Sequence, residues 1–187
     1  MKRELKLELK HLAPYLPYGL KLYTKGSGNE YIRTLAGLSD KGVSVYSKTD
    51  PVASDQKINL YKPILKPISN LDGGQLIELF EIAYKQVYKT VDETLNNFHF
   101  HGWDDDNFGL VVNDDTFTYG FSMDFEGQQD FRFSYKHINA EYPNSMLMIN
   151  KLELFEKLIE WHFDVFNLIG LGLAIDATTL NYDAICY

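Results

Sequence analysis

Residues 116–125, TFTYGFSMDF, alternate between apolar and polar side chains, and this alternation constrains the fold more than any other feature of the chain. Alternate residues of an extended chain share one side, and here that side is apolar: Phe117, Tyr119, Phe121, Met123 and Phe125. Similar runs, FGLVVN and DFRFSYKHI, precede and follow this segment across the short joins DD and EGQQ. The pattern predicts an antiparallel three-strand meander with one buried and one solvated face.

Two longer segments have apolar residues spaced by three or four, which is typical of one buried helical face. The first covers about residues 74–97 and follows Asp72, a residue type that caps helices. The second covers about residues 146–169, and Gly170 and Gly172 supply its stop. We therefore expect two long helices.

Shorter elements are expected in the first third of the chain. Residues 2–12 suit a short amphipathic helix that ends at the prolines which follow. The runs YIRTLAGL and GVSVYS, separated by SDKG, predict a β-hairpin. In INLYKPILKPI, Pro63 and Pro67 predict an edge strand or an irregular packed segment, because proline donates no backbone hydrogen bond.

These elements together predict an α+β fold in a single domain, residues 1–187. The N-terminal hairpin and the three-strand meander form an antiparallel sheet, against which the two long helices pack. A chain of this length buries a substantial core without disulfides or metal, and no internal repeat divides it.

The cysteine content and the first residues indicate a soluble cytoplasmic protein. Cys186 is the only cysteine, which excludes an intramolecular disulfide and a cysteine zinc site. The start, MKRELKLELKHLAPYLPYG, is charged throughout and lacks the apolar core of a signal peptide. No apolar stretch approaches the roughly 20 residues that span a bilayer. We expect no membrane association and no cofactor.

Charge is distributed unevenly along the chain. The formal net charge is -8, but residues 1–70 hold 12 basic and 6 acidic residues, whereas residues 71–187 hold 6 and 20. Ten carboxylates occur between residues 92 and 130 without one Lys or Arg: Asp92, Glu93, Asp104, Asp105, Asp106, Asp114, Asp115, Asp124, Glu126 and Asp130. Such a run attracts a cation or a basic protein surface and repels nucleic acid. A solvated face that only promotes solubility is the other interpretation.

The segment HGWDDDNFG, residues 101–109, raises the question of a metal site. As an EF-hand loop beginning at Asp104 it fails, because Phe108 occupies a ligand position and a strand, not a helix, is expected to follow. A transition-metal site would use His99 and His101 with Asp104 or Asp106, since two imidazoles and a carboxylate leave one position open for water. A polar turn between packed elements explains the same residues.

Two further titratable residues have structural interpretations. His162 lies on the apolar stripe of the second predicted helix, which favours a core histidine whose ring nitrogens are hydrogen-bonded. Asp176, in AIDATTL, is typical of a turn or helix cap. No nucleophile elbow, phosphate loop, dinucleotide-binding glycine pattern or HExxH motif occurs in the chain. A non-enzymatic function is therefore favoured.

Three blocks, APYLPYGLK (13–21), KPILKPISNL (62–71) and EWHFDVFNLIGLGLAIDATTL (160–180), carry a resemblance. The chain resembles small proteins of phages and mobile elements of Bacteroidota, in which similar blocks occur in the same order. The resemblance implies no catalytic residue. It implies that an acidic binding protein of this kind inhibits a host defence system that targets nucleic acid, and a CRISPR effector of type VI is one such target.

The leading hypothesis is a protein-binding module whose acidic face meets a basic protein surface, such as that of a nuclease or another nucleic-acid-binding protein. The residues assigned to this face are Asp104, Asp105, Asp106, Asp114, Asp115, Asp124 and Glu126. The alternative is a metal-dependent hydrolase or nuclease that uses His99, His101 and a nearby Asp. The oligomeric state does not follow from the residues.

Overall fold

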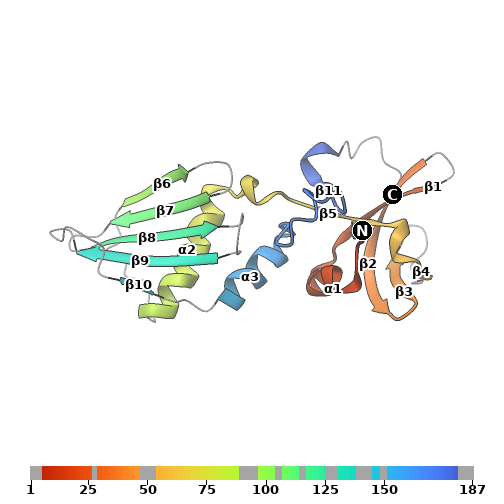
Figure 1. Ribbon diagram of the computed structural model, residues 1–187, viewed down its shortest axis with the longest axis horizontal. Helices are drawn as coiled ribbons and strands as arrows, with labels where there is room; N and C mark the ends of the chain where they lie inside the picture. Colours follow the sequence, from red (N-terminus) through yellow and green to blue (C-terminus); the bar gives the residue numbers. More distant parts are fainter. Residues whose placement is uncertain are drawn as a thin grey trace, which may run out of the picture. The chain divides into compact units, whose positions relative to one another are not determined.

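A computed structural model describes most of the chain (Figure 1). The described residues are 6–26, 29–46, 54–88, 97–103, 107–113, 117–124, 130–137, 145–147 and 151–180. For the described residues between 86 and 147, only the backbone is described, except at Phe121, whose side chain is also described.

The chain forms two compact units, and the sequence of one interrupts the sequence of the other. The inserted unit is Ser69–Lys157, and the outer unit combines Met1–Ile68 with Leu158–Tyr187. Each unit is described by itself below. The expected single domain stays a prediction.

The outer unit contains a six-stranded sheet in the order β11-β5-β1-β2-β3-β4. Its strands are β1 (Lys21–Gly26), β2 (Asn29–Ser39), β3 (Gly42–Tyr46), β4 (Ser54–Gln56), β5 (Lys62–Leu65) and β11 (Ile175–Asp176). All neighbours pair antiparallel except β11 and β5, which are parallel. Its short helices are α1 (Leu9–Leu12) and the 3-10 turns η1 (Ala13–Tyr18), η2 (Ile58–Leu60) and η4 (Ala177–Thr179).

The predicted N-terminal hairpin is confirmed as β2 and β3. Ser39 pairs with Gly42 across a two-residue turn, and a bulge lies between Leu35 and Gly37. Gly42 has a φ of 140°, a conformation that residues with a Cβ rarely adopt. A Cβ at this position would also overlap the backbone carbonyl oxygen of Gln56 in the neighbouring strand β4. Glycine is therefore required where the hairpin meets β4.

The proline-containing segment is not an edge strand, contrary to the prediction. β5 lies between β11 and β1 inside the sheet. The parallel partner β11 pairs only with Ile64 and Leu65, so the missing N–H of Pro63 lies outside that ladder. On the other side Pro63 pairs with Leu22 of β1. The proline is tolerated because its partner strand on one side is very short.

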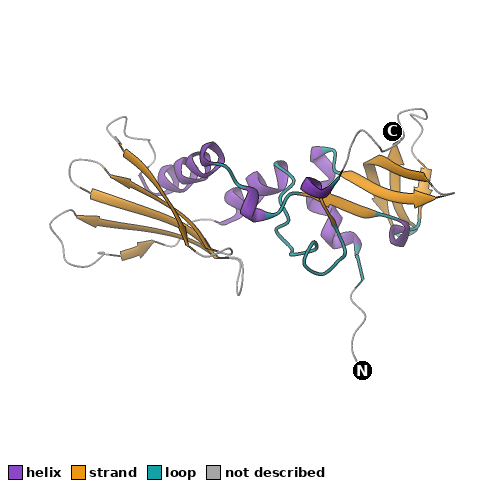
Figure 2. Cartoon of the chain, turned by 90° about the horizontal axis from the view of Figure 1, so that it is seen from above, coloured by secondary structure: helices purple, strands orange, loops and turns teal. Residues whose placement is uncertain are grey.

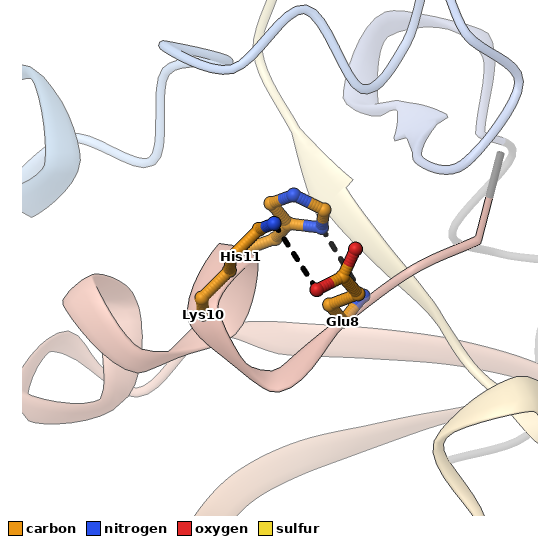
Figure 3. A network of polar contacts seen from close by, with 3 residues as sticks. All are labelled: Glu8, Lys10 and His11. Carbon is orange, nitrogen blue, oxygen red and sulfur yellow. Dashed lines mark hydrogen bonds and ion pairs between the residues drawn. The ribbon is translucent and has the colours of Figure 1, made fainter.

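Helix α1 begins after Glu8, where exposed polar groups form a local network (Figure 3). The backbone N–H of Glu8 donates to Nδ1 of His11 over 3.1 Å, and Lys10 Nζ lies 3.1 Å from a carboxylate oxygen of Glu8. Both charged partners are largely exposed, so the ion pair adds little to stability. The contacts define the first turn of a short helix and form no binding site.

The inserted unit contains a five-stranded antiparallel sheet in the order β10-β9-β8-β7-β6. Its strands are β6 (Asn97–Trp103), β7 (Asn107–Asn113), β8 (Phe117–Asp124), β9 (Asp130–His137) and β10 (Ser145–Leu147). The predicted three-strand meander is confirmed as β7, β8 and β9, and Phe121, on its predicted apolar side, is buried. Strands β6 and β10 extend it on either side.

Helix α2 (Gly73–Tyr88) lies against one face of this sheet and contacts β7 (Figures 1 and 2). Its start is confirmed: the Asp72 carboxylate accepts from the Gln75 backbone N–H, and the Gln75 side chain accepts from the Asp72 N–H. It has 16 residues. Of the predicted helix at 74–97, residues 89–96 lie outside the described residues, and Asn97 begins a strand.

The prediction of a second long helix over residues 146–169 is wrong. Residues Ser145–Leu147 form β10, which pairs with β9, and α3 covers Lys151–Glu160 only. The fold is α+β as expected, but among the described residues three α-helices occur, of 4, 16 and 10 residues, instead of two long ones. The expected single antiparallel sheet is two sheets, and the larger one is mixed.

Replacing Gly42 by alanine should destabilise the protein by about 2 kcal/mol or more, because the new Cβ is strained at this φ and overlaps Gln56. Gly26→Ala is the matched control, since a Cβ there has no neighbouring atom within 4 Å. Urea unfolding followed by circular dichroism measures both. Equal midpoints for the two variants would contradict the assigned register of β3 and β4.

Candidate functional site

The strand register of the inserted unit brings acidic positions together at one end of its sheet. Trp103 pairs with Asn107, Asn107 with Asp124, and Asp124 with Asp130. We call these four aligned positions the terminal row. Asp124 and Asp130 are therefore direct cross-strand neighbours, although five residues separate them in the sequence.

Several predicted site residues lie outside the described residues, and the structure places only the strand ends next to them. Asp104, Asp105 and Asp106 follow Trp103, and Glu126 lies between Asp124 and Asp130. The residues that flank each of these two acidic segments in the sequence therefore all belong to the terminal row. The backbone brings together strand ends that the sequence separates by about 20 residues.

The strand end that precedes the remaining acidic pair in the sequence lies at the other end of the sheet. Asp114 and Asp115, also outside the described residues, follow Asn113. Asn113 pairs with Asn97 and with Thr118, and Thr118 pairs with Lys136. The register thus separates the strand end before Asp114 and Asp115 from the terminal row.

The histidines of the predicted metal site lie in β6, where only the backbone is described. His99 pairs with Val111 and His101 with Gly109 of β7. β7 also confirms that a strand follows HGWDDDNFG, as expected from the failed EF-hand match. Among side chains that the structure describes, no group of three His, Cys, Asp or Glu residues could hold a metal ion. The site of His99, His101, Asp104 and Asp106 stays a prediction.

The two units also differ in net charge. The inserted unit holds 6 basic and 16 acidic residues, a formal net charge of -10. The outer unit holds 12 basic and 10 acidic residues, a net charge of +2. The acidic excess is therefore a property of one compact unit.

A second set of polar residues lies in the outer unit, after α3. The helix ends in a Schellman turn: Phe163 N donates to Leu158 O and His162 N donates to Ile159 O, both over 2.9 Å. His162 occupies the left-handed position of this turn with a φ of 62°, where glycine is usual. The prediction that His162 lies on a helical stripe is therefore wrong, because the helix has already ended.

The ring of His162 is held by a backbone carbonyl. Its Nε2 lies 2.9 Å from the carbonyl oxygen of Tyr18, so the neutral ring donates a hydrogen bond from that nitrogen. Burial lowers the pKa of His162, and the Tyr18 carbonyl opposes this shift while Lys66 and Lys21 add to it. The expectation of a hydrogen-bonded histidine is confirmed for Nε2.

Asp164 is buried and organises the turn that follows. Its two carboxylate oxygens accept separately from the backbone N–H groups of Leu168, over 2.8 Å, and Ile169, over 2.6 Å. Burial raises the pKa of Asp164, and these hydrogen bonds oppose the shift. Each oxygen has its own donor, as buried carboxylates require.

Parts of three sequence blocks, residues 13–21, 62–71 and 160–180, come together in the outer unit. The Tyr15 hydroxyl donates to the Phe163 carbonyl over 2.6 Å, and both side chains are fully buried. Lys66 and Phe163 form a parallel bridge, with Lys66 N donating to His162 O and Asp164 N donating to Lys66 O. Lys62 Nζ donates to Gly172 O over 2.8 Å. We call these contacts the block junction.

The contacts of the block junction hold segments of the outer unit together. Each of the hydrogen bonds named above has a backbone group as one partner. Asp176 serves similarly as the cap of η4, as predicted, with Oδ1 accepting from Thr178 N over 2.8 Å. Sequence reasoning missed the role of His162 because no glycine occurs at the end of α3.

The chain has no match among protein-family models, curated proteins or solved structures. Within the described part of the chain, every helix is too short or too polar to cross a membrane.

Replacing His162 by asparagine should flatten the dependence of stability on pH. Because burial lowers the folded pKa of His162 below its ordinary 6.5, its contribution is present above that value and is lost as pH falls through the folded pKa. Asparagine tolerates the left-handed backbone but does not titrate in this range. Unfolding free energies measured from about pH 7.5 to 5 should fall less in the variant. An equal fall of the unfolding free energy with pH in both proteins would refute the lowered pKa assigned to His162.

Replacing Asp164 by asparagine should cost about 1–3 kcal/mol of stability, because the new amide group faces one of two backbone donors. Asp176→Asn is the matched control. Asp176 accepts from Thr178 N and from Thr178 Oγ1 with the same oxygen, which asparagine can reproduce. Thermal and urea unfolding compare the two. The interpretation fails if both variants are equally stable.

Proposed function

We propose that the protein is a non-enzymatic binding module whose inserted unit binds a basic protein surface. The observation that carries the proposal is the net charge of -10 on that unit, against +2 on the outer unit. Solubility depends on the overall charge of a protein. It therefore does not require one unit to be much more acidic than the other. The charge difference also directs a basic partner to one part of the molecule.

The terminal row adds a second argument. Asp124 and Asp130 are aligned acidic positions on neighbouring strands, and the sequence places Asp104 directly after Trp103 and Glu126 two residues after Asp124. Cationic groups of a partner are attracted to acidic positions gathered in this way. The row is therefore the part of the inserted unit best suited to a basic surface.

The chemistry of the partner follows from the charge. A basic groove built for nucleic acid has a strong positive potential, and an acidic protein can compete for it with DNA or RNA. We propose a nuclease or another nucleic-acid-binding protein as the partner. Together with the resemblance to proteins of phages and mobile elements, this supports inhibition of a host defence system.

Reversing Asp104, Asp105 and Asp106 to lysine should abolish partner binding. The matched control reverses Glu81, Glu153 and Glu156, which belong to the same unit and change its charge equally. Each protein serves as bait in a pull-down from host extract at about 0.05 M and about 0.5 M salt. The partner should bind the wild type and the control at low salt only.

Two results would contradict the proposal. One is a partner that binds the aspartate variant and the control equally well. The other is bound metal in the purified protein, or a thermal shift with zinc, manganese or calcium that His99→Ala and His101→Ala remove. The second result would favour a metal-dependent hydrolase.

A further inference from the structure

Among the described residues, the two sheets have four edge strands, and these differ in length. In the outer unit the edge strands β4 and β11 have 3 and 2 residues, and in the inserted unit β10 has 3. The fourth edge strand, β6, has 7 residues and pairs with β7 along its whole length (Figure 1). Short edges offer few backbone groups to another chain, whereas β6 presents a complete strand.

The sequence of β6 lacks the residues that usually block an edge. Asn97–Trp103, NFHFHGW, contains no lysine, proline, aspartate or glutamate. Its register with β7 advances one residue at a time, without the shift that bends β2 against β3. An edge strand that is long, regular and without such residues is a template for strand addition.

Charge selects the occupant of this edge. A second copy would bring two units of net charge -10 together, which is unfavourable. A basic extended segment meets the opposite situation, because its charge is opposite to the net charge of the unit that contains β6. The charge therefore favours a basic polypeptide strand.

We infer that β6 binds an extended basic segment of a partner protein as a sixth strand of the inserted sheet. This inference rests on the proposed function and specifies how the partner docks. Backbone groups of alternate β6 residues face the added strand, so about three or four residues each offer one N–H and one C=O. The added strand would extend over roughly 20–24 Å. Main-chain hydrogen bonds supply affinity, and the acidic unit selects the charge.

The test uses the full-length protein and three fluorescein-labelled octapeptides: alternating Lys and Val, the same peptide N-methylated at every residue, and alternating Glu and Val. N-methylation removes backbone donors and leaves the charge unchanged. Fluorescence polarisation should show binding of the unmodified Lys-Val peptide and at least a tenfold weaker affinity for the methylated and the acidic peptides.

Equal binding of the methylated and unmodified basic peptides would overturn strand addition and leave the acidic binding function standing. Failure of every peptide, with the pull-down still positive, would overturn it as well. Loss of both peptide and pull-down binding would contradict the inference and the proposed function together. A dimer in sedimentation that the Lys-Val peptide does not dissociate would assign the edge to a second copy.

Variants of β6 provide an independent measurement. Successive amides of a strand alternate between its two neighbours, so one of His99→Pro and Phe100→Pro removes an amide that faces β7 and the other removes an outward one. The outward variant should keep the circular dichroism spectrum of the wild type and lose at least tenfold in affinity for the Lys-Val peptide. Unchanged affinity in the variant that keeps the wild-type spectrum would overturn the inference.

Discussion

The reversal of the chain at His162 is the constraint on which the outer unit depends. A left-handed residue there ends α3 and directs Phe163 to the Tyr15 hydroxyl and to the bridge with Lys66. The buried carboxylate of Asp164 then closes the next turn and leads the chain to β11 beside β5. A left-handed conformation at a residue other than glycine costs about 1–2 kcal/mol. Buried contacts made by the following residues offset that cost.

This reversal also shows where sequence reasoning reached its limit. The predicted apolar stripe continues from α3 through His162, Phe166 and Ile169, whereas the residues that are buried after the helix are Phe163, Val165 and Leu168, which lie in a turn. The spacing of apolar residues in a sequence does not distinguish a helix from an irregular turn with buried residues. The contact that decides between them joins Tyr15 to Phe163, which are 148 residues apart. By contrast, the meander and the start of α2 follow from neighbouring residues, and both were predicted correctly.

The acidic site was predictable in composition but not in arrangement. Counting charges along the sequence found the acidic run, and it could not show that the excess belongs to one compact unit. The alignment of Asp124 with Asp130 depends on strand register, which the joins between strands set. The length of β6 as a sheet edge was missed for a related reason. The predicted helix ended at Asn97, the first residue of β6, and His99 and His101 were interpreted as possible metal ligands instead of strand residues.

The insertion of one unit into the other has a consequence for how the protein is made. Strands β1 to β5 leave the ribosome first, but β11 and the block junction come from residues that follow the inserted unit. At roughly 5–20 residues per second, the roughly 90 intervening residues take roughly 5–20 s to synthesise. During that time the inserted unit can acquire its structure while the outer unit lacks its last segment. The part of the chain proposed to bind a partner is thus complete before the part that flanks it.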